Sequence, residues 1–517
     1  MIRSLFFSLV LGVIICNPGE SHPGPDDEDR SDEQKENYQG TIVEMFEWKW
    51  LDIADECERY LGPAGFGAVQ VSSPAENLIL RTQDGKRSWH ERNLIMSYKL
   101  ETRLGNEEDF AAMTKKCTNV GVKVYASVII NHMTGDHDHN VGTGNSTADF
   151  KTFCYPGVPY EKEHFHCPTC NLSDYEDKDQ VYNCQLDGLK DLNQTHPHVK
   201  EMIVGYLNHL ISLGAAGFRI QYAKFIDPKD LKNIVECLDN LNTECGFPEN
   251  IKPYIYLEVL PGGAVKGSDY FPLGLPVTEY KISEELYKIF SGKKSLNCLS
   301  TWADDSWDFI PSDNAIVFVD NHDLQRCSDP KSLTFKEELL YKVATTFLLA
   351  QPYGRPIVMS SYSFATLEQG PPSDEHECIT SPVIKEDGLG CVGAEWVCEH
   401  RWSPIRELVN FRKVIGNAKV KNWWDNGKNQ IAFSRGTKGF IVFNLEGIPF
   451  NQTLQTGLPA GEYCDIISGK RDGDKCTGQK ISVCKNGEAE VCLSGDAQAN
   501  ELVIAIHVGK ESCLSAE

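Results

Sequence analysis

From about residue 40, short apolar segments rich in β-branched and aromatic residues alternate with stretches of helical periodicity. Seven segments stand out: TIVEMF, GFGAVQV, VKVYASVII, AGFRI, YIYLEV, AIVFVD and RPIVMSSY. Segments of this length, separated by helices, are typical of parallel strands joined by crossover connections. Because seven or eight such units are present, the pattern predicts an α/β fold, with a closed (β/α)8 TIM barrel favoured over an open sheet.

The stretch from residue 191 to residue 214 illustrates the helical pattern between two of these segments. Its apolar side chains recur every three or four positions, at Val199, Ile203, Tyr206, Leu207, Leu210 and Ile211. This spacing predicts a helix with one buried face, and Gly214 provides a C-terminal stop.

Two regions depart from the alternation. Residues 131–192 carry Gly, Asp, His and Cys without regular periodicity, which predicts a loop domain inserted after the third strand. Residues 419–517 contain short strands separated by turns, as in NQIAFSRGTKGFIVFNLEG and KISVCKNGEAEVCLSG, which predicts an antiparallel β domain. The barrel is then expected to comprise residues 39–130 and 193–418.

The beginning of the chain predicts export from the cell. Residues 1–22 include the short apolar stretch MIRSLFFSLVLGVIIC, which is typical of a cleaved secretory signal peptide and too short for a membrane span. Residues 23–38 are acidic and are interpreted as a solvated linker. The 19 cysteines leave an even number once Cys16 is set aside, which favours disulfides and an extracellular, secreted protein. Four sequons are compatible with glycosylation: Asn145, Asn171, Asn193 and Asn451.

The charge of the chain narrows the classes of partner. A formal net charge of −24 argues against nucleic acid, because phosphate binding requires clustered Lys and Arg. A neutral substrate is easier to accommodate, and no segment after the signal peptide is expected to enter a membrane. We expect a monomer.

Polar residues follow several of the predicted strands. In a parallel barrel, the reactive groups lie where the strands end. Three segments lead into such groups, namely Glu258 after YIYL, Asn131 and His132 after VII, and Asn321, His322 and Asp323 after AIVFVD. A single carboxylate there could equally cap a helix, but the combination predicts an active-site face.

Long strings across the chain resemble the animal α-amylases of glycoside hydrolase family 13. They include FEWKWLDIADECERYLGPAGFGAVQVSSPAENL, VIINHM, LGAAGFRI, FVDNHD, VMSSY, WVCEHRW and LQTGLPAGEYCDIISG, all in the family's order. The resemblance implies a (β/α)8 barrel, a loop domain after strand 3 and a C-terminal Greek-key β domain. It also implies cleavage of α-1,4-glucosidic bonds with retention, through a nucleophile, an acid/base and a third carboxylate.

The resemblance assigns roles to individual residues. Glu258 matches the acid/base and Asp323 the third carboxylate, whereas the nucleophile position holds Gln221, an amide that cannot replace a carboxylate. The positions implied for substrate binding are Trp89, Tyr175, His132, Arg219, Lys224 and His322.

Residues near Gln221 also depart from the family pattern. Tyr222 replaces a small residue, Phe225 a His and Ser127 an Asp. His90, Asn93 and Leu94 replace a Trp, a Tyr and a Gln. We therefore expect a family member with hydrolysis lost or strongly impaired that still binds an α-1,4-glucan or maltooligosaccharide. Two alternatives stay open: an active α-amylase with a substitute nucleophile, and a secreted non-catalytic interaction protein.

The resemblance also implies two ions. Asn131 and Asp191 match the side-chain ligands of the family's calcium ion, whose remaining protein ligands would be the carbonyls of Tyr182 and Phe225. For chloride, Arg219 and Asn321 match two ligands. Ile357 replaces the second Arg, and Arg355 stands two residues earlier. Weakened chloride binding is therefore expected.

Disulfide pairings follow from the resemblance only in part. It implies the pairs Cys57–Cys117, Cys391–Cys398 and Cys464–Cys476, and it pairs Cys184 with either Cys167 or Cys170. From their spacing, Cys484 could pair with Cys492, and Cys237 with Cys245. A metal site at CPTC (residues 167–170) has the right spacing, but no second ligand pair is evident, so disulfides are favoured.

Overall fold

The computed structural model of the protein describes residues 40–327, 331–495 and 502–516. The signal peptide and the acidic linker predicted from the sequence lie outside these residues. Within the described ranges, no helix is both long enough and apolar enough to span a bilayer.

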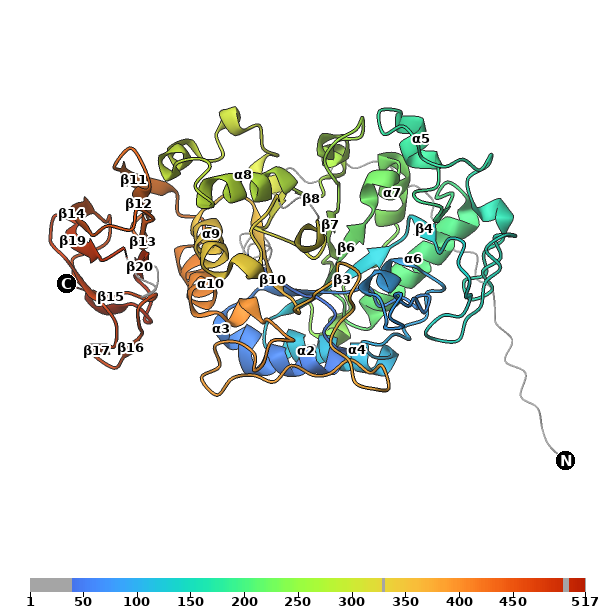
Figure 1. Ribbon diagram of the computed structural model, residues 1–517, viewed down its shortest axis with the longest axis horizontal. Helices are drawn as coiled ribbons and strands as arrows, with labels where there is room; N and C mark the ends of the chain where they lie inside the picture. Colours follow the sequence, from blue (N-terminus) through green and yellow to red (C-terminus); the bar gives the residue numbers. More distant parts are fainter. Residues whose placement is uncertain (1–39, 328–330, 496–501, 517) are drawn as a thin grey trace.

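A closed barrel of eight parallel strands forms the centre of the molecule (Figure 1). Its strands are β1 (Ile42–Met45), β2 (Ala68–Val71), β3 (Lys123–Ile129), β6 (Gly217–Gln221), β7 (Tyr254–Leu257), β8 (Val277–Thr278), β9 (Ala315–Val317) and β10 (Arg355–Ser360). Each barrel strand pairs with the barrel strand that precedes or follows it in the sequence. The first strand, β1, also pairs with the last, β10, with Ile42 opposite Ile357. The predicted barrel is therefore confirmed, and seven strands coincide with the seven apolar segments. The pattern did not identify β8, which has only two residues.

Helices surround the barrel (Figure 1). They are α2 (Trp50–Glu56), α3 (Gly62–Ala64), α4 (Glu107–Asn119), α6 (Pro197–Ser212), α7 (Pro228–Val235), α8 (Tyr280–Phe290), α9 (Glu338–Ala350) and α10 (Ser403–Ile415). The helix α6 buries the six apolar residues that the periodicity selected. Gly214 follows its end with φ of 96°, a left-handed conformation that glycine adopts without strain.

The chain leaves the barrel between β3 and β6 and forms an irregular segment at one end of the molecule (Figure 1). A two-stranded antiparallel ladder closes its base, in which β4 (His132–Met133) pairs with β5 (Lys190–Asp191). The segment also contains the helix α5 (Lys178–Asn183). This ladder holds the beginning and the end of the inserted segment together beside the barrel.

A C-terminal domain of antiparallel sheets lies at the opposite end (Figure 1). Its strands are β11 (Val420–Asp425), β12 (Gln430–Arg435), β13 (Gly439–Asn444), β14 (Phe450–Gln455), β15 (Gly461–Cys464), β16 (Arg471–Asp472), β17 (Lys475–Cys476), β18 (Lys480–Val483), β19 (Glu488–Leu493), β20 (Val503–His507) and β21 (Cys513–Ala516). The largest sheet has the order β11-β12-β13-β20. Exposed and buried residues alternate along β19, as expected for a strand with one wet face.

Four disulfides form among the described residues: Cys57–Cys117, Cys170–Cys184, Cys391–Cys398 and Cys464–Cys476. The three pairs implied by the resemblance are confirmed. Of the two possible partners of Cys184, the structure shows Cys170. Because Cys170 is oxidised, the CPTC metal site is excluded; the described residues also hold no group of three or more His, Cys, Asp or Glu placed to bind a metal.

The two pairings suggested by spacing are wrong. The thiols of Cys237, Cys245, Cys484 and Cys492 are all free. Around the turn that follows Cys484, β18 pairs with β15 whereas β19 pairs with β14, so Cys484 and Cys492 do not face each other across a ladder. The sulfur of Cys245 points instead to the carbonyl of Ser212, 3.8 Å away.

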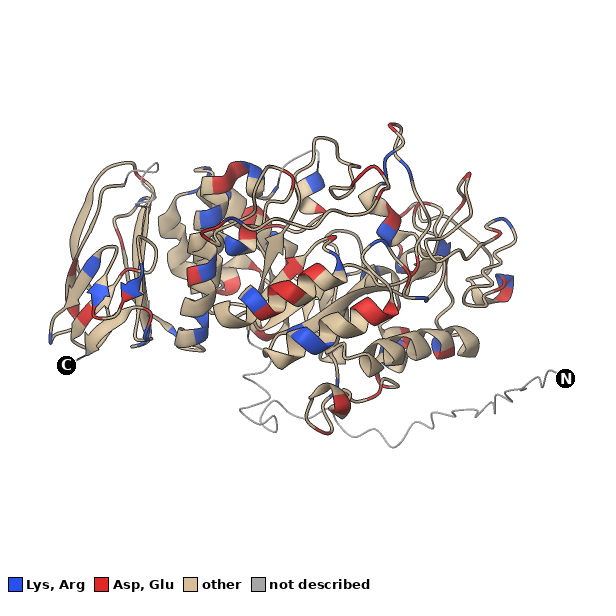
Figure 2. Cartoon of the chain, turned by 90° about the horizontal axis from the view of Figure 1, so that it is seen from below, with Lys and Arg blue, Asp and Glu red and all other residues tan. Residues whose placement is uncertain are grey.

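Acidic and basic residues are interspersed along the outer helices of the barrel and over the C-terminal sheets (Figure 2).

Candidate active site

The carboxyl ends of the barrel strands bring most of the predicted catalytic positions together. In the parallel register, Ser127 of β3 lies opposite Arg219 of β6, and Arg219 lies opposite Tyr256 of β7. Gln221 is the last residue of β6, and Glu258 directly follows β7. Because the strands are parallel, these side chains face one end of the barrel, as the sequence predicted.

Gln221 lines a narrow cavity at this end of the barrel. Its neighbours in the cavity wall are Glu44, Phe46, Glu47, Ser72, Ser73, Trp89, Arg92, Asn93, Ser127, Arg219 and His322. The cavity encloses about 260 Å³ of empty space and opens to solvent.

Three donors converge on the buried carboxylate of Glu258. Arg219 Nη2 and the Tyr280 hydroxyl both donate to Oε1, the latter over 3.4 Å, and the backbone N–H of Tyr222 donates to Oε2 over 3.0 Å. Burial lowers the pKa of Arg219, but the carboxylates of Glu258 and Glu44 outweigh it, so the pKa lies above its usual value. An acid catalyst must direct a proton from one of its oxygens to the leaving group. Each oxygen of Glu258 accepts at least one hydrogen bond, which leaves one of its about four lone-pair sites free.

Tyr222 holds this arrangement in place from the backbone. Its φ of 57° is left-handed, a conformation that costs a non-glycine residue about 1–2 kcal/mol. The turn aims the Tyr222 N–H at Glu258, and the ring packs edge-to-face on His132 at 4.9 Å. The residue beside the missing nucleophile thus contacts two other predicted site residues.

His322 lies between two carboxylates. Its Nδ1 is 2.7 Å from Glu44 Oε1, and its Nε2 is 3.5 Å from Asp323 Oδ2. Burial lowers the pKa of His322, but the charges of Asp323 and Glu44 outweigh it and raise the pKa above that of a free imidazole. Glu44 did not emerge from the sequence reasoning. The available signal was a lone carboxylate within the apolar segment TIVEMF.

The remaining predicted substrate-binding residues differ in how accessible they are. Trp89 is half-buried and donates from its indole to the Leu367 carbonyl over 2.9 Å. Tyr175 is 44% exposed. The buried Lys224 donates to the carbonyls of Leu260 and Gly262, so its ammonium supports a loop. The pKa of His132 falls to about 4, chiefly through burial, and its Nε2 faces the Asn93 carbonyl over 3.2 Å.

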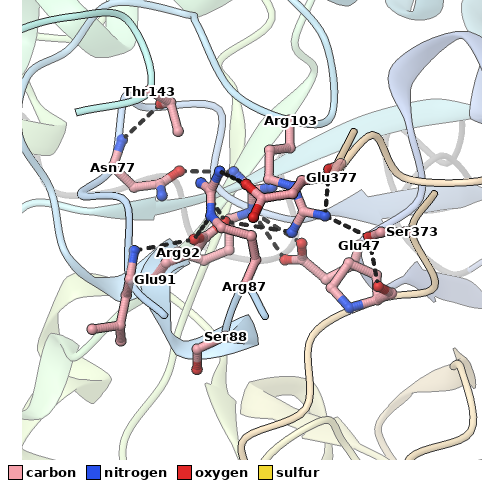
Figure 3. Close-up of polar contacts among 12 residues, drawn as sticks. Glu47, Asn77, Arg87, Ser88, Glu91, Arg92, Arg103, Thr143, Ser373 and Glu377 are labelled. Atoms are coloured by element: carbon pink, nitrogen blue, oxygen red, sulfur yellow. Dashed lines mark hydrogen bonds and ion pairs between the residues drawn. The ribbon is translucent and has the colours of Figure 1, made fainter. Parts of the chain in front are cut away.

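A buried ion-pair network braces one side of the cavity (Figure 3). Arg92 Nε contacts both carboxylate oxygens of Glu47, at 3.1 and 3.0 Å, and its Nη1 donates to Asn77 Oδ1 over 2.7 Å. Nearby, Arg87 donates to Glu91 over 2.6 Å, and Arg103 donates to the carbonyl of Glu377 over 3.0 Å.

The network joins loops that are far apart in the sequence. It connects the residues after β1, the segment between β2 and α4, and the loop after β10 (Figure 3). Because Glu47 and Arg92 also line the cavity, the shape of the cavity depends on these charge pairs.

The residues proposed for calcium fit a cation. The Oδ1 atom of Asn131 is buried without a hydrogen-bond partner. Asp191 is also buried, and desolvation raises its pKa to about 6, although His166, 2.5 Å from Oδ2, opposes the shift. A hard cation bound by oxygen ligands would satisfy both side chains. The carbonyls of Tyr182 and Phe225 belong to α5 and to the 3-10 turn η4 (Ala223–Phe225).

Of the residues proposed for chloride, Arg219 has an Nη1 that is buried without a hydrogen-bond partner and could face an anion, whereas the second Arg is absent. Asn321 donates its amide to the Tyr280 hydroxyl over 3.2 Å, and Ile357 is buried at the position of the expected second Arg. Arg355 donates to Gly40 and to the Tyr125 hydroxyl, both over 3.1 Å, near the start of β10. The Arg355 guanidinium therefore forms its hydrogen bonds at the opposite end of the barrel from Gln221.

Comparison with known proteins identifies α-amylase domains and α-amylase relatives. Residues 94–250 match the family "Alpha amylase, catalytic domain", and residues 422–506 match "Alpha amylase, C-terminal all-beta domain". An alpha-amylase-related protein of Drosophila mauritiana is 46% identical, covering 90% of this chain and 93% of the relative. An alpha-amylase of Tenebrio molitor is 46% identical, over 90% and 97%.

A solved structure is similar over the same length. A mutant of alpha-amylase I from Eisenia fetida, in complex with maltohexaose, matches with a TM-score of 0.85 and 36% identity, covering 91% of this chain and 97% of that one.

Proposed function

Because the chain belongs to the α-amylase family, we propose that it is a secreted member that binds α-1,4-glucans and has lost most or all of its hydrolytic activity. The observation that carries the proposal is the pair Gln221 and Glu258. The nucleophile position holds an amide, and the acid/base carboxylate is occupied by Arg219, Tyr222 and Tyr280. Retaining hydrolysis therefore lacks its nucleophile, and its acid/base is engaged by three donors.

Residual glucan binding is supported by the accessible residues of the site. Asp323 is 38% exposed, and Trp89 and Tyr175 present aromatic surface. Sugar rings pack well on such surfaces, which combine an apolar face with a polar edge. The relative from Eisenia fetida binds maltohexaose on the same fold.

An active enzyme with a substitute nucleophile is less well supported. The cavity wall beside Gln221 holds two carboxylates, Glu44 and Glu47, but Glu44 is bonded to His322 and Glu47 to Arg92. Secretion is supported by the disulfides and by the exposed sequon residues Asn145, Asn171 and Asn451.

Calorimetric titration with maltoheptaose tests the binding half of the proposal. We expect saturable heat at millimolar ligand or below. Replacement of Trp89 by Ala should weaken binding about tenfold, since a stacked aromatic ring contributes about 1.5 kcal/mol. Trp423→Ala, in the C-terminal domain, is the matched control and should leave affinity unchanged. Absence of heat with the wild-type protein would reject glucan binding and leave the non-catalytic interaction protein.

Chelation of divalent cations tests the proposed calcium ion. Treatment with EDTA is expected to lower the melting temperature of the wild-type protein by several degrees, because a cation at about 100 times its Kd stabilises the folded state by about 2.7 kcal/mol. Differential scanning calorimetry with and without added CaCl₂ measures the effect. The variant Asp191→Asn should melt at the same temperature in both conditions. An equal response of the variant and the wild type would place the cation elsewhere.

A further inference from the structure

Glu44 is a buried carboxylate inside the barrel that none of the roles above uses. It lies on β1 between Gln70 of β2 and Met359 of β10 in the parallel register. Its side chain is only 6% exposed, and it lines the same cavity as Gln221. A buried carboxylate is costly unless it is paired and hydrogen-bonded, so its partner indicates its role.

The partner of Glu44 is His322, which is fixed on all sides. The imidazole stacks on Phe46 with ring centres 4.6 Å apart and an interplanar angle of 10°. One ring nitrogen faces Glu44 at 2.7 Å, and the other faces Asp323 at 3.5 Å. An imidazolium donates at both nitrogens, whereas a neutral ring would turn a lone pair toward one of the carboxylates. The geometry therefore suits the cation.

Two other charged side chains lie near this ring. Arg219 opposes protonation of His322 through its positive charge, and Arg326 donates from Nη1 to the His322 carbonyl over 2.8 Å. Both are guanidinium groups and stay charged at all relevant pH values. A second imidazole, that of His90 on the other side of Trp89, also interacts with Asp323; burial lowers the pKa of His90, and the charge of Asp323 opposes this.

Asp323 connects this pair to the cleft. Its side chain is 38% exposed, whereas those of His322 and Glu44 are 5% and 6% exposed. A ligand at the mouth would therefore meet Asp323 first, and Glu44 would act on it only through the imidazole.

We propose that Glu44 is a positioning residue of the site, which holds His322 as a cation and through it fixes the carboxylate of Asp323 for ligand binding. The ligand is the α-glucan of the proposed function, on which this part of the inference rests. Glucan binding should then be retained at acidic and neutral pH and lost as the pH rises through the titration of His322. Removing Glu44 moves that loss to lower pH.

Titration of His322 by NMR, without any glucan, tests the inference independently of binding. In Glu44→Gln, the resonance of His322, assigned by its absence in His322→Asn, should titrate at lower pH than in the wild type. The matched control is Glu56→Gln, which removes a buried carboxylate bonded to His400 at 2.8 Å outside the cavity. This control should leave the titration of His322 unchanged.

Maltoheptaose titrations across pH supply the second measurement. Glu44→Gln should weaken binding about tenfold at neutral pH, as expected for a lost charged hydrogen bond. In the His322→Asn background, Glu44→Gln should have no further effect on affinity, and the pH dependence should disappear. If Glu44→Gln does not fold, His322→Asn alone still tests the pH dependence.

The outcomes are distinct. An unchanged titration of His322 in Glu44→Gln would overturn the inference, as would additive effects of the two substitutions on affinity. If the wild type does not bind maltoheptaose but the titration of His322 is shifted in Glu44→Gln, the proposed function is overturned. Glu44 would then act only on the charge of His322 and on its contact with Asp323.

Discussion

Soluble starch incubated with the wild-type protein is expected to yield new reducing ends at about 10³- to 10⁴-fold below the rate of an ordinary animal α-amylase. Loss of a covalent nucleophile removes on the order of 5 kcal/mol of barrier lowering, and an amide at Gln221 cannot supply it. A reducing-sugar assay with equal protein concentrations measures the difference. Turnover within about tenfold of the ordinary enzyme would contradict the proposed loss.

Restoring the carboxylate with Gln221→Asp should not recover full activity. Tyr222, Phe225 and Ser127 still depart from the family pattern, and Glu258 is still held by Arg219 and the Tyr222 N–H. We expect the variant to stay about 10²-fold or more below an ordinary α-amylase, because general acid catalysis alone contributes about that factor. Full recovery would show that the groups around Glu258 rearrange freely when the nucleophile returns.

Replacement of Arg92 by Ala is expected to destabilise the protein by about 3–5 kcal/mol. The guanidinium is buried and bonded to Glu47 and Asn77, so its removal leaves an uncompensated buried carboxylate (Figure 3). Chemical denaturation monitored by tryptophan fluorescence measures the change in the free energy of unfolding.

Arg81→Ala is the matched control for this prediction. Arg81 also pairs with a carboxylate, that of Glu377, but its side chain is 45% exposed. Exposed pairs contribute about 0–1 kcal/mol, so the control should differ little from the wild type. Similar losses for both variants would mean that the effect does not depend on burial of the charge.

The sequence predicted the architecture more completely than the site. Apolar segments bounded by turns are long enough to identify seven barrel strands, whereas Val277–Thr278 is too short to produce a periodic signal. Strand ends predicted that Glu258 and Gln221 would meet, because parallel strands present their carboxyl ends on one face. The donors that occupy Glu258 could not be predicted, since they depend on the left-handed turn at Tyr222 and on the direction of the Arg219 side chain.

The partners of Glu44 and Arg355 could not be predicted from the local sequence pattern. Both lie on barrel strands, and alternation along a strand does not say which charged side chain will find a partner inside. Glu44 turned out to face His322, and Arg355 to face Tyr125 at the other end of the barrel. Their roles depend on contacts between strands that are distant in the sequence.

The pairing of β1 with β10 has a consequence for how the chain folds. The first barrel strand to be synthesised, β1, cannot pair with β10 until β10 has left the ribosome, so this edge of β1 stays unpaired until then. Such long-range closure is slow and exposes the nascent chain to aggregation. The disulfide Cys57–Cys117 joins segments that are made early, and it is available to stabilise the first part of the barrel during this wait.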